Sequence, residues 1–221
     1  MPISEVYNED CMIGMSRYPD KYFDLAIVDP PYGIGISNYE QIGTSKKHKI
    51  KTWDNQIPTK EYFDELKRLT KNQIIWGVNY FDGFGLNGGR IVWNKLGTSI
   101  GHRENPPSFS DCELAYCSVG VNIKMFSYTY IGNVQGNNYQ ILWSKTDRIH
   151  PTQKPVQLYK WLLRNYAKLG DKILDTHLGS GSSRIACFDG GFDFVGFEID
   201  KDYYEAQEKR FQNHILQQKL F

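Results

Sequence analysis

Cysteine is scarce in this 221-residue chain, and nothing in it fits a metal site, a membrane span or a secretion signal. The four cysteines form no Cys-x-x-Cys pair, so we expect reduced thiols and a cytoplasmic protein. No stretch approaches the roughly 20 apolar residues that span a membrane, and the start, Met1-Pro2-Ile3-Ser4-Glu5, lacks the basic-then-apolar layout of a signal peptide. The five histidines show no His-x-x-x-His spacing, and we therefore expect no metal.

A strong charge of one sign is also absent, since the formal net charge is +1. The distribution of the charge is more informative than its sum, because Lys46, Lys47, Lys49 and Lys51 fall in one short polar stretch. Such a run is either a solvated loop or a contact for phosphate.

Hydrophobic periodicity predicts an α/β fold. Strand-like runs alternate with helical patterns that follow Thr59, Pro155 and Asp200, and this alternation is typical of a mostly parallel sheet with helices on both faces. The predicted strands are 24–28, 73–76, 90–93, 112–117, 172–175 and 193–197. We find no repeat and no linker, so we expect one domain over residues 1–221.

Two long polar stretches lack a clear period. Loops of this length inside a compact domain are usually functional or mobile. We expect a mobile loop near 34–58 and an insertion near 119–148.

The sequence Asp29-Pro30-Pro31-Tyr32-Gly33 follows the apolar strand that ends at Val28. Because such a strand delivers its carboxyl-terminal loop to the ligand crevice of an open α/β sheet, this placement favours function over an ordinary turn. The prolines stiffen the loop and leave carbonyl oxygens free, Asp29 adds an acceptor, and Tyr32 offers a flat face for a base.

A second candidate site covers 175–183, where a Gly-rich loop follows a strand and opens a helix. The pattern G-x-G-x-x-G fails because Arg184 stands at its last position, and the phosphate-loop pattern is absent. Glu198 ends the next strand, where a carboxylate can accept both hydroxyls of a ribose. A ribose acceptor without a phosphate cradle favours S-adenosylmethionine over a dinucleotide. The alternative is a tight turn followed by a helix-capping acid.

The segment His150-Pro151-Thr152-Gln153-Lys154-Pro155 lies between the two sites in sequence. Lys154, held between prolines before a helix, is suited to a ligand carboxylate. The alternative is a proline-punctuated helix start with an exposed lysine.

With these three motifs, nearly the whole chain resembles the circularly permuted amino-methyltransferases of DNA, the beta class, in the adenine-specific type that carries Asp-Pro-Pro-Tyr. The stretches Asn8–Cys11, Trp93–Lys95 and Cys112–Leu114 are also similar to that family. Two positions depart from its pattern: His177 stands where an apolar aromatic is usual, and the target-recognition region near 119–148 is short.

The resemblance implies a Rossmann-like methyltransferase that uses S-adenosyl-L-methionine, releases S-adenosyl-L-homocysteine and acts on double-stranded DNA with the base flipped out. A homodimer and a cognate restriction enzyme are further partners that it allows, and a membrane partner is not expected. The implied catalytic residues are Asp29, Pro30, Pro31 and Tyr32. The lysine run follows this loop, and its charge leads us to expect DNA phosphate contacts from Lys46, Lys47, Lys49 and Lys51. The implied cofactor contacts are Asp10, Cys11, Asp29, His150, Thr152, Lys154, Asp175, His177, Gly179, Ser180, Gly181, Ser183, Glu198 and Ile199.

The expected reaction is methylation of the exocyclic N6 amine of adenine. The absence of a Pro-Cys dipeptide excludes methylation of cytosine carbon. Amino (N4) methylation of cytosine remains open, although Ser is more frequent than Asp at position 29 in that branch of the family. RNA or protein amide methylation, a nicotinamide oxidoreductase, and a silent relative that only binds cofactor or DNA are less favoured functions. The target sequence and the biological setting stay open.

Overall fold

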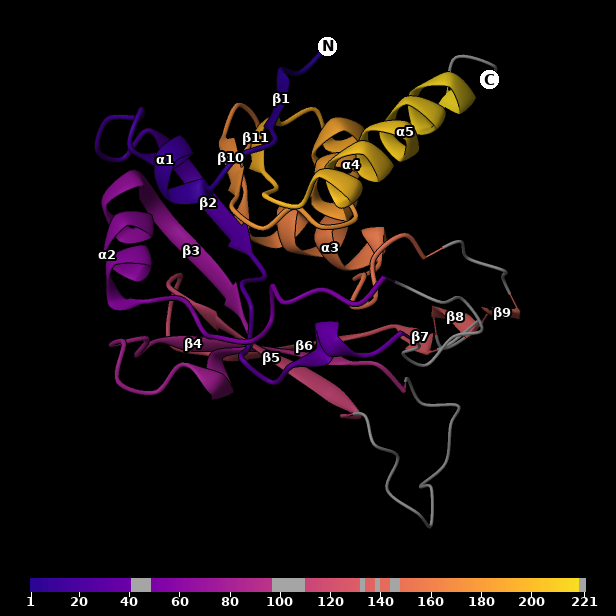
Figure 1. Ribbon diagram of the computed structural model, residues 1–221, viewed down its shortest axis with the longest axis horizontal. Helices are drawn as coiled ribbons and strands as arrows, with labels where there is room; N and C mark the ends of the chain where they lie inside the picture. Colours follow the sequence, from indigo (N-terminus) through magenta and orange to yellow (C-terminus); the bar gives the residue numbers. More distant parts are fainter. Residues whose placement is uncertain (41–48, 97–109, 132–133, 138–139, 144–147, 219–221) are drawn as a thin grey trace.

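A computed structural model describes residues 1–40, 49–96, 110–131, 134–137, 140–143 and 148–218. Its centre is an eight-stranded, mostly parallel sheet with helices on both sides, which confirms the predicted fold class (Figure 1). The strand order is β1-β11-β10-β2-β3-β5-β4-β6, and the antiparallel pairs are those that β5 makes with β3 and β4. These strands are Ser4–Tyr7 (β1), Phe23–Val28 (β2), Thr70–Trp76 (β3), Gly89–Asn94 (β4), Cys112–Cys117 (β5), Ile123–Ser127 (β6), Lys172–Asp175 (β10) and Asp193–Phe197 (β11).

The helices cover the sheet in two groups. Helices α1 (Cys11–Met15) and α2 (Lys60–Leu69) lie on one face, and α3 (Val156–Tyr166), α4 (Ser182–Gly190) and α5 (Lys201–Gln218) lie on the other (Figure 1). Two 3-10 turns, η1 (Ile36–Asn38) and η2 (Val78–Tyr80), follow β2 and β3. A separate antiparallel sheet joins β7 (Thr129–Ile131), β8 (Val134–Asn137) and β9 (Gln140–Trp143).

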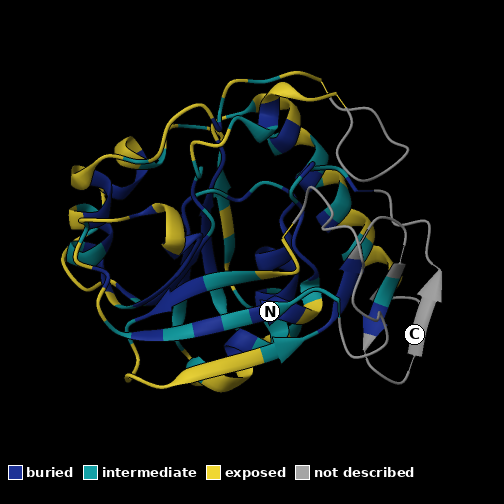
Figure 2. Cartoon of the chain, turned by 90° about the horizontal axis from the view of Figure 1, so that it is seen from below, coloured by how far each residue is buried: buried dark blue, intermediate teal, exposed yellow. Residues whose placement is uncertain are grey.

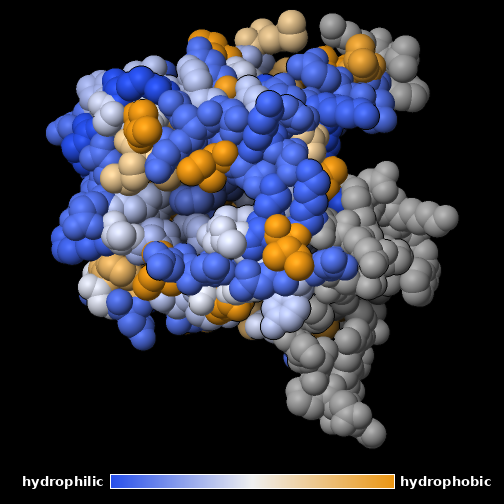
Figure 3. All heavy atoms as spheres, in the orientation of Figure 1, coloured by the Kyte–Doolittle hydropathy of each residue, from blue (hydrophilic) through white to orange (hydrophobic). Residues whose placement is uncertain are grey.

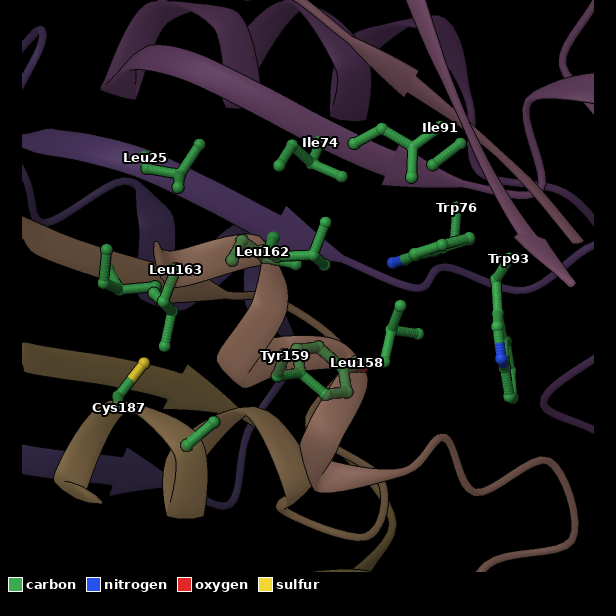
Figure 4. Packing of buried hydrophobic residues seen from close by; sticks show 14 of the residues in the cluster. Leu25, Ile74, Trp76, Ile91, Trp93, Leu158, Tyr159, Leu162, Leu163 and Cys187 are labelled. Atoms are coloured by element: carbon green, nitrogen blue, oxygen red, sulfur yellow. The ribbon is translucent and has the colours of Figure 1, made fainter. Parts of the chain in front are cut away.

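The apolar residues of β2 alternate between the two faces, as the period of a strand requires. Leu25 and Ile27 pack in the cluster of α3, whereas Ala26 and Val28 pack in the cluster of α2. Figure 4 shows the first cluster, in which Leu158 and Leu162 of α3 lie against the sheet beside Trp76. The central strands are therefore buried on both sides (Figure 2).

The chain reverses its winding direction between β10 and β2, which are neighbours in the sheet. Helix α2 connects β2 to β3 on one side of this pair, and α4 connects β10 to β11 on the other. The carboxyl ends at such a switch point leave a crevice for a ligand. The topology thus confirms that the loops after Val28 and after Asp175 meet at one point of the sheet.

The predicted strands and helices are present, with two additions at the start and a difference in the middle. Strand β1 and helix α1 were not predicted, because β1 carries little apolar pattern and the five residues of α1 are too few to show a helical period. Residues 119–148, which show no period in sequence, contain β6 and the three-stranded sheet. Apolar residues are scattered over the face seen in Figure 3 and do not gather in one patch. Among the described residues, no helix is long and apolar enough to cross a membrane.

Candidate active site

A cavity of about 600 Å³ lies at the carboxyl ends of β2 and β10. Its volume falls in the range of about 300–1,000 Å³ that is usual for small-molecule sites. The wall includes the loop after β2, the loop after β10, the end of β11 and the segment before α3. The predicted site residues that line it are Asp29, Pro30, Pro31, Tyr32, His150, Thr152, Lys154, His177, Gly179, Ser180, Glu198 and Ile199.

Asp29 and Tyr32 form a hydrogen-bonded pair in the loop after β2. The Tyr32 hydroxyl donates to Asp29 Oδ1 at 2.5 Å. The Tyr32 ring stacks on Tyr80 of η2, with ring centroids 5.0 Å apart and planes at 15°. Gly77 is needed beneath it, because a Cβ there would lie 2.1 Å from Tyr32 Cε1 and the residue has φ +77°. One face of Tyr32 is therefore covered by Tyr80, which itself lines the cavity.

Asp54 fixes the backbone of this loop. Its Oδ1 accepts the Tyr32 N–H at 2.7 Å and the Gly33 N–H at 3.1 Å, and its Oδ2 accepts the Ile36 N–H at 2.9 Å. Asp54 is only 1% exposed, and hydrogen bonds to a charged group are strong in such a site. Asp54 belongs to residues 49–58, called the strap below, and its neighbour Trp53 lines the cavity.

The strap is attached to the opposite side of the cavity as well. Lys51 pairs with Asp200 Oδ2 and Asp202 Oδ2, both at 2.7 Å, just beyond Glu198. Lys49 also pairs with Asp202, at 3.0 Å. Two of the four lysines predicted to contact DNA thus hold acidic side chains here, and Lys46 and Lys47 lie outside the described residues.

Lys154 points toward the loop after β2. Its ammonium is hydrogen-bonded to Asp29 Oδ2 and to the Tyr32 hydroxyl at 3.2 Å, and it forms an ion pair with Glu113 Oε2 at 3.1 Å. Two of these contacts are hydrogen bonds, and the buried Glu113 Oε2 has no hydrogen-bond partner among the described residues. Burial acts to lower the pKa of Lys154, but the carboxylates of Asp29 and Glu113 outweigh it and raise that pKa. The lysine is therefore charged.

Glu198 connects the end of β11 to the Gly-rich loop. Its Oε2 accepts the Gly179 N–H at 2.8 Å, and its Oε1 accepts the Asp200 N–H at 2.9 Å. Burial raises the pKa of Glu198 to about 7, although both backbone donors act to lower it. Each oxygen keeps a second acceptor position, so the carboxylate can still accept two hydroxyls.

His177 lines the cavity beside this loop, whereas Asp175, the last residue of β10, does not line it. Asp175 accepts from the Ser183 hydroxyl at 2.6 Å and from the His177 N–H at 3.1 Å, and burial raises its pKa to about 7. Burial lowers the pKa of His177 to about 4. At neutral pH the imidazole is uncharged, so this ring remains a flat, neutral surface where the family usually has an apolar aromatic.

The remaining predicted residues lie near the cavity without sharing one role. Asp10 accepts the Met12 N–H at 2.8 Å and caps α1, while Cys11 lies close to Glu198, and neither lines the cavity. Gly181, with φ +70°, is the N-cap of α4. Ser183 lies in the first turn of this helix, where it is buried and does not line the cavity. The His150 ring lies between Trp53 and Tyr203, with centroids 5.0 and 4.3 Å away.

Several cavity residues had no assigned role from sequence, namely Trp53, Asp54, Lys95, Glu113, Arg148 and Tyr203. The only signal was regional, since Trp53 and Asp54 lie in the long polar stretch 34–58, which was expected to be a mobile loop because loops of this length are usually functional or mobile. Among the described residues, no group of three or more His, Cys, Asp or Glu side chains could hold a metal.

The comparisons with known proteins agree with this geometry. The DNA methylase model of the N6 and N4 methyltransferases matches residues 92–209. The type II methyltransferase M2.MboI of Moraxella bovis is 25% identical over 93% of this chain and 86% of its own length.

Two solved structures share the fold. The M1.HpyAVI–SAM complex superposes with a TM-score of 0.58 at 20% identity, covering 93% of this chain and 98% of that one. The cytosine-N4-specific PvuII DNA methyltransferase also gives 0.58, at 14% identity, over 95% of this chain and 87% of that one. The family model spans more than half of the chain and includes the segment before α3, the Gly-rich loop and Glu198. The chain therefore belongs to the N6/N4 DNA methylase family.

Proposed function

We propose that the protein transfers a methyl group from S-adenosylmethionine to the N6 amine of a flipped-out adenine in DNA. The observation that carries this proposal is the meeting of two loops in one cavity. The Asp29–Tyr32 loop supplies acceptors for an amine, and the loop 176–181 with Glu198 supplies an adenosine site. Because β2 and β10 are adjacent, a methyl donor and its acceptor can lie side by side there.

The residues of the cavity fit the cofactor. Glu198 has acceptor positions for a ribose, and the loop at Gly179 has φ +51°, where a side chain would strain the backbone. Acidic side chains in the cavity lining (Asp29, Asp54, Asp111, Glu113 and Glu198) outnumber basic ones (Lys95, Arg148 and Lys154), which suits a cationic ligand. When bound, S-adenosylmethionine supplies a methyl group on a positively charged sulfur. M1.HpyAVI was solved in a complex with the same molecule.

Asp29 and the Pro30 carbonyl act on the target amine. The lone pair of an exocyclic amine is delocalised into its ring, so hydrogen bonds to two acceptors favour a tetrahedral nitrogen with an available lone pair. The methylated nitrogen then loses a proton, for which Asp29 is the nearest carboxylate in this loop. Positioning supplies most of the effect, because the amine becomes acidic only after methylation.

Asp29 is the feature that favours adenine over cytosine. PvuII methyltransferase is cytosine-N4-specific and shares the fold, so the fold alone does not choose between the two bases. In this family a Ser is more frequent at the first motif position among cytosine enzymes. Extruding a base costs a few kcal/mol, and stacking on the Tyr32–Tyr80 pair can return about 1–3 kcal/mol.

The test is identification of the product. The protein is incubated with labelled cofactor and mixed-sequence duplex DNA, and the DNA is digested to nucleosides. We expect N6-methyladenine from the wild type. We expect none from Asp29→Ala, whose cofactor affinity stays within about tenfold because Asp29 acts on the amine.

Asp64→Ala is the matched control, since Asp64 is exposed on α2 and pairs with Lys60 outside the cavity. It should keep wild-type activity. N4-methylcytosine as the sole product would contradict the adenine assignment and leave the family intact. Full activity in Asp29→Ala would contradict the assigned chemistry.

A further inference from the structure

We propose that Lys154 and Glu113 are positioning residues for Asp29: Lys154 holds the carboxylate in its reactive orientation, and Glu113 neutralises the charge of Lys154. The assignment rests on the proposed function. The three side chains are called the charge array below. It differs from the sequence-based expectation for Lys154, which placed this lysine on a carboxylate of the ligand.

Lys154 is buried against side chains of the protein itself, with two hydrogen bonds and one ion pair. Its side chain is 3% exposed, and its partners are Asp29 Oδ2, the Tyr32 hydroxyl at 3.2 Å and Glu113 Oε2 at 3.1 Å. Tyr32 in turn donates to the other oxygen of Asp29. Asp29 is thus held through both oxygens, which fixes the direction of its remaining acceptor positions.

The array crosses three strands of the sheet. Asp29 follows β2, Glu113 lies on β5, and the neighbour of both is β3, whose Trp76 ring lies 5.6 Å from the Lys154 ammonium. Pro155 is the N-cap of α3 and has an extended backbone, so Lys154 enters the cavity from a stiff segment. A buried charge without a partner is costly, which makes each member depend on the others.

The presence of Glu113, the second carboxylate of the array, has an electrostatic explanation. Methyl transfer places positive charge on the target nitrogen, and Asp29 is its counter-charge. Lys154 alone would cancel that negative charge at close range. With Glu113 the array has a net charge of −1. Lys95, which also lines the cavity, contacts the other oxygen of Glu113 at 3.3 Å and brings the four side chains to zero, so Glu113 is shared between two ammonium groups.

The two partners act on Asp29 in opposite directions. Burial raises the pKa of Asp29, the ammonium of Lys154 lowers it, and the carboxylate of Glu113 raises it further. Since the reaction needs ionised Asp29, the rate rises with pH through that pKa. The acid limb of the pH–rate profile is the range in which the rate rises with pH. Removing Lys154 must move this limb to higher pH, and removing the charge of Glu113 must move it to lower pH.

Further titratable groups also face Asp29, and they remain unchanged in the variants below. They are Tyr32 in its own loop, Asp175 on β10, Tyr62 on α2 and Tyr159 on α3.

The experiment measures the single-turnover methylation rate against pH, with cofactor prebound and DNA saturating. We expect Lys154→Met to lower the maximal single-turnover rate, the plateau of the profile, by about 10²-fold, the effect of a misplaced catalytic group. The same variant should move the acid limb to higher pH. Glu113→Gln should lower the plateau rate by about tenfold and move the acid limb to lower pH. Lys154→Arg, which keeps the positive charge, should show its acid limb at the same pH as the wild type.

Lys160→Met is the matched control, because Lys160 pairs with Asp189 of α4 and neither residue lines the cavity. It should change neither plateau nor limb. Cofactor affinity should stay within about threefold in all variants. A wild-type rate in Lys154→Met together with weaker cofactor binding would place Lys154 on the ligand and overturn the proposal.

Carboxyl NMR titration of Asp29 in the same proteins separates this proposal from the proposed function. A wild type that methylates no base would refute the function, while the titration still tests the array. Opposite shifts in Lys154→Met and Glu113→Gln support the array, and equal or absent shifts overturn it. If Lys154→Met does not fold, the two remaining variants decide. An acid limb at lower pH in Glu113→Gln and at the wild-type pH in Lys154→Arg supports the array, and an unchanged limb in Glu113→Gln overturns it.

Discussion

At the scale of single residues, Glu198 has an ionisation that falls near neutral pH. Burial raises its pKa from an ordinary 4.5 to about 7. A carboxyl group whose pKa is raised on folding favours the folded state below its unfolded pKa, and this contribution is lost as the pH rises through about 7. Ribose hydroxyls, by contrast, donate best to the ionised form.

We therefore expect the affinity for S-adenosylmethionine to rise between pH 6 and pH 8, by up to about tenfold from this one group. Calorimetry at several pH values measures it, with Glu198→Gln as the reference. Asp175, whose pKa is also raised to about 7 by burial, and the ligand titrate in both proteins, so the ratio of the two affinities isolates Glu198. A ratio of affinities that does not change with pH would show that Glu198 does not bind the ribose hydroxyls.

At the scale of elements, the strap connects the loop after β2 to Asp200 and Asp202, which follow β11. Asp54 takes three backbone N–H groups from residues 32–36, and the backbone N–H of Lys51 donates to the Ser37 carbonyl at 2.9 Å. The Lys51 ammonium then reaches Asp200 and Asp202. The loop that carries Tyr32 is thus held by residues that follow it in sequence.

Asp54→Ala should lower the free energy of unfolding by at least about 2 kcal/mol, since it leaves three backbone donors without a charged acceptor. The methylation rate should fall by about tenfold or more in protein that remains folded. Urea unfolding and single-turnover kinetics measure the two effects. Asp20→Ala removes an exposed partner of Arg68 and should stay within about 0.5 kcal/mol. Wild-type stability in Asp54→Ala would show that the strap does not hold the loop.

At the scale of the whole molecule, the cavity joins segments that are distant in the chain. Its walls come from the loop after β2, the strap, the segment before α3, the loop after β10 and the end of β11. A ligand that contacts several of them binds the folded state and not the unfolded chain, so it must raise the stability of the molecule as one unit.

At a concentration 100 times its Kd, S-adenosylmethionine should stabilise the protein by about 2.7 kcal/mol. For a chain of this size we expect Tm to rise by about 5–10 °C. A thermal scan measures it, and NAD at the same concentration is the control for a nicotinamide oxidoreductase. A rise with NAD and none with S-adenosylmethionine would contradict the proposed cofactor.

The sequence by itself determined the central strands, the helices α2 to α5 and the two loops of the site. Residues 24–28 and 172–175 are apolar runs bounded by polar residues, so local chemistry was sufficient to define β2 and β10. Gly and Pro marked the loops at Asp29 and Gly179, because each restricts the backbone locally. Strand β1, with the sequence Ser-Glu-Val-Tyr, carries too little apolar pattern and forms by pairing with β11.

Only the tertiary structure decided which side chains meet in the cavity. Lys154 is 125 residues from Asp29, and its pairing with Asp29 and Glu113 depends on β5 lying antiparallel beside β3. Asp54 likewise finds its three donors only because the chain turns back after η1. Charged side chains choose partners by distance and burial, and neither quantity is a local property of the sequence.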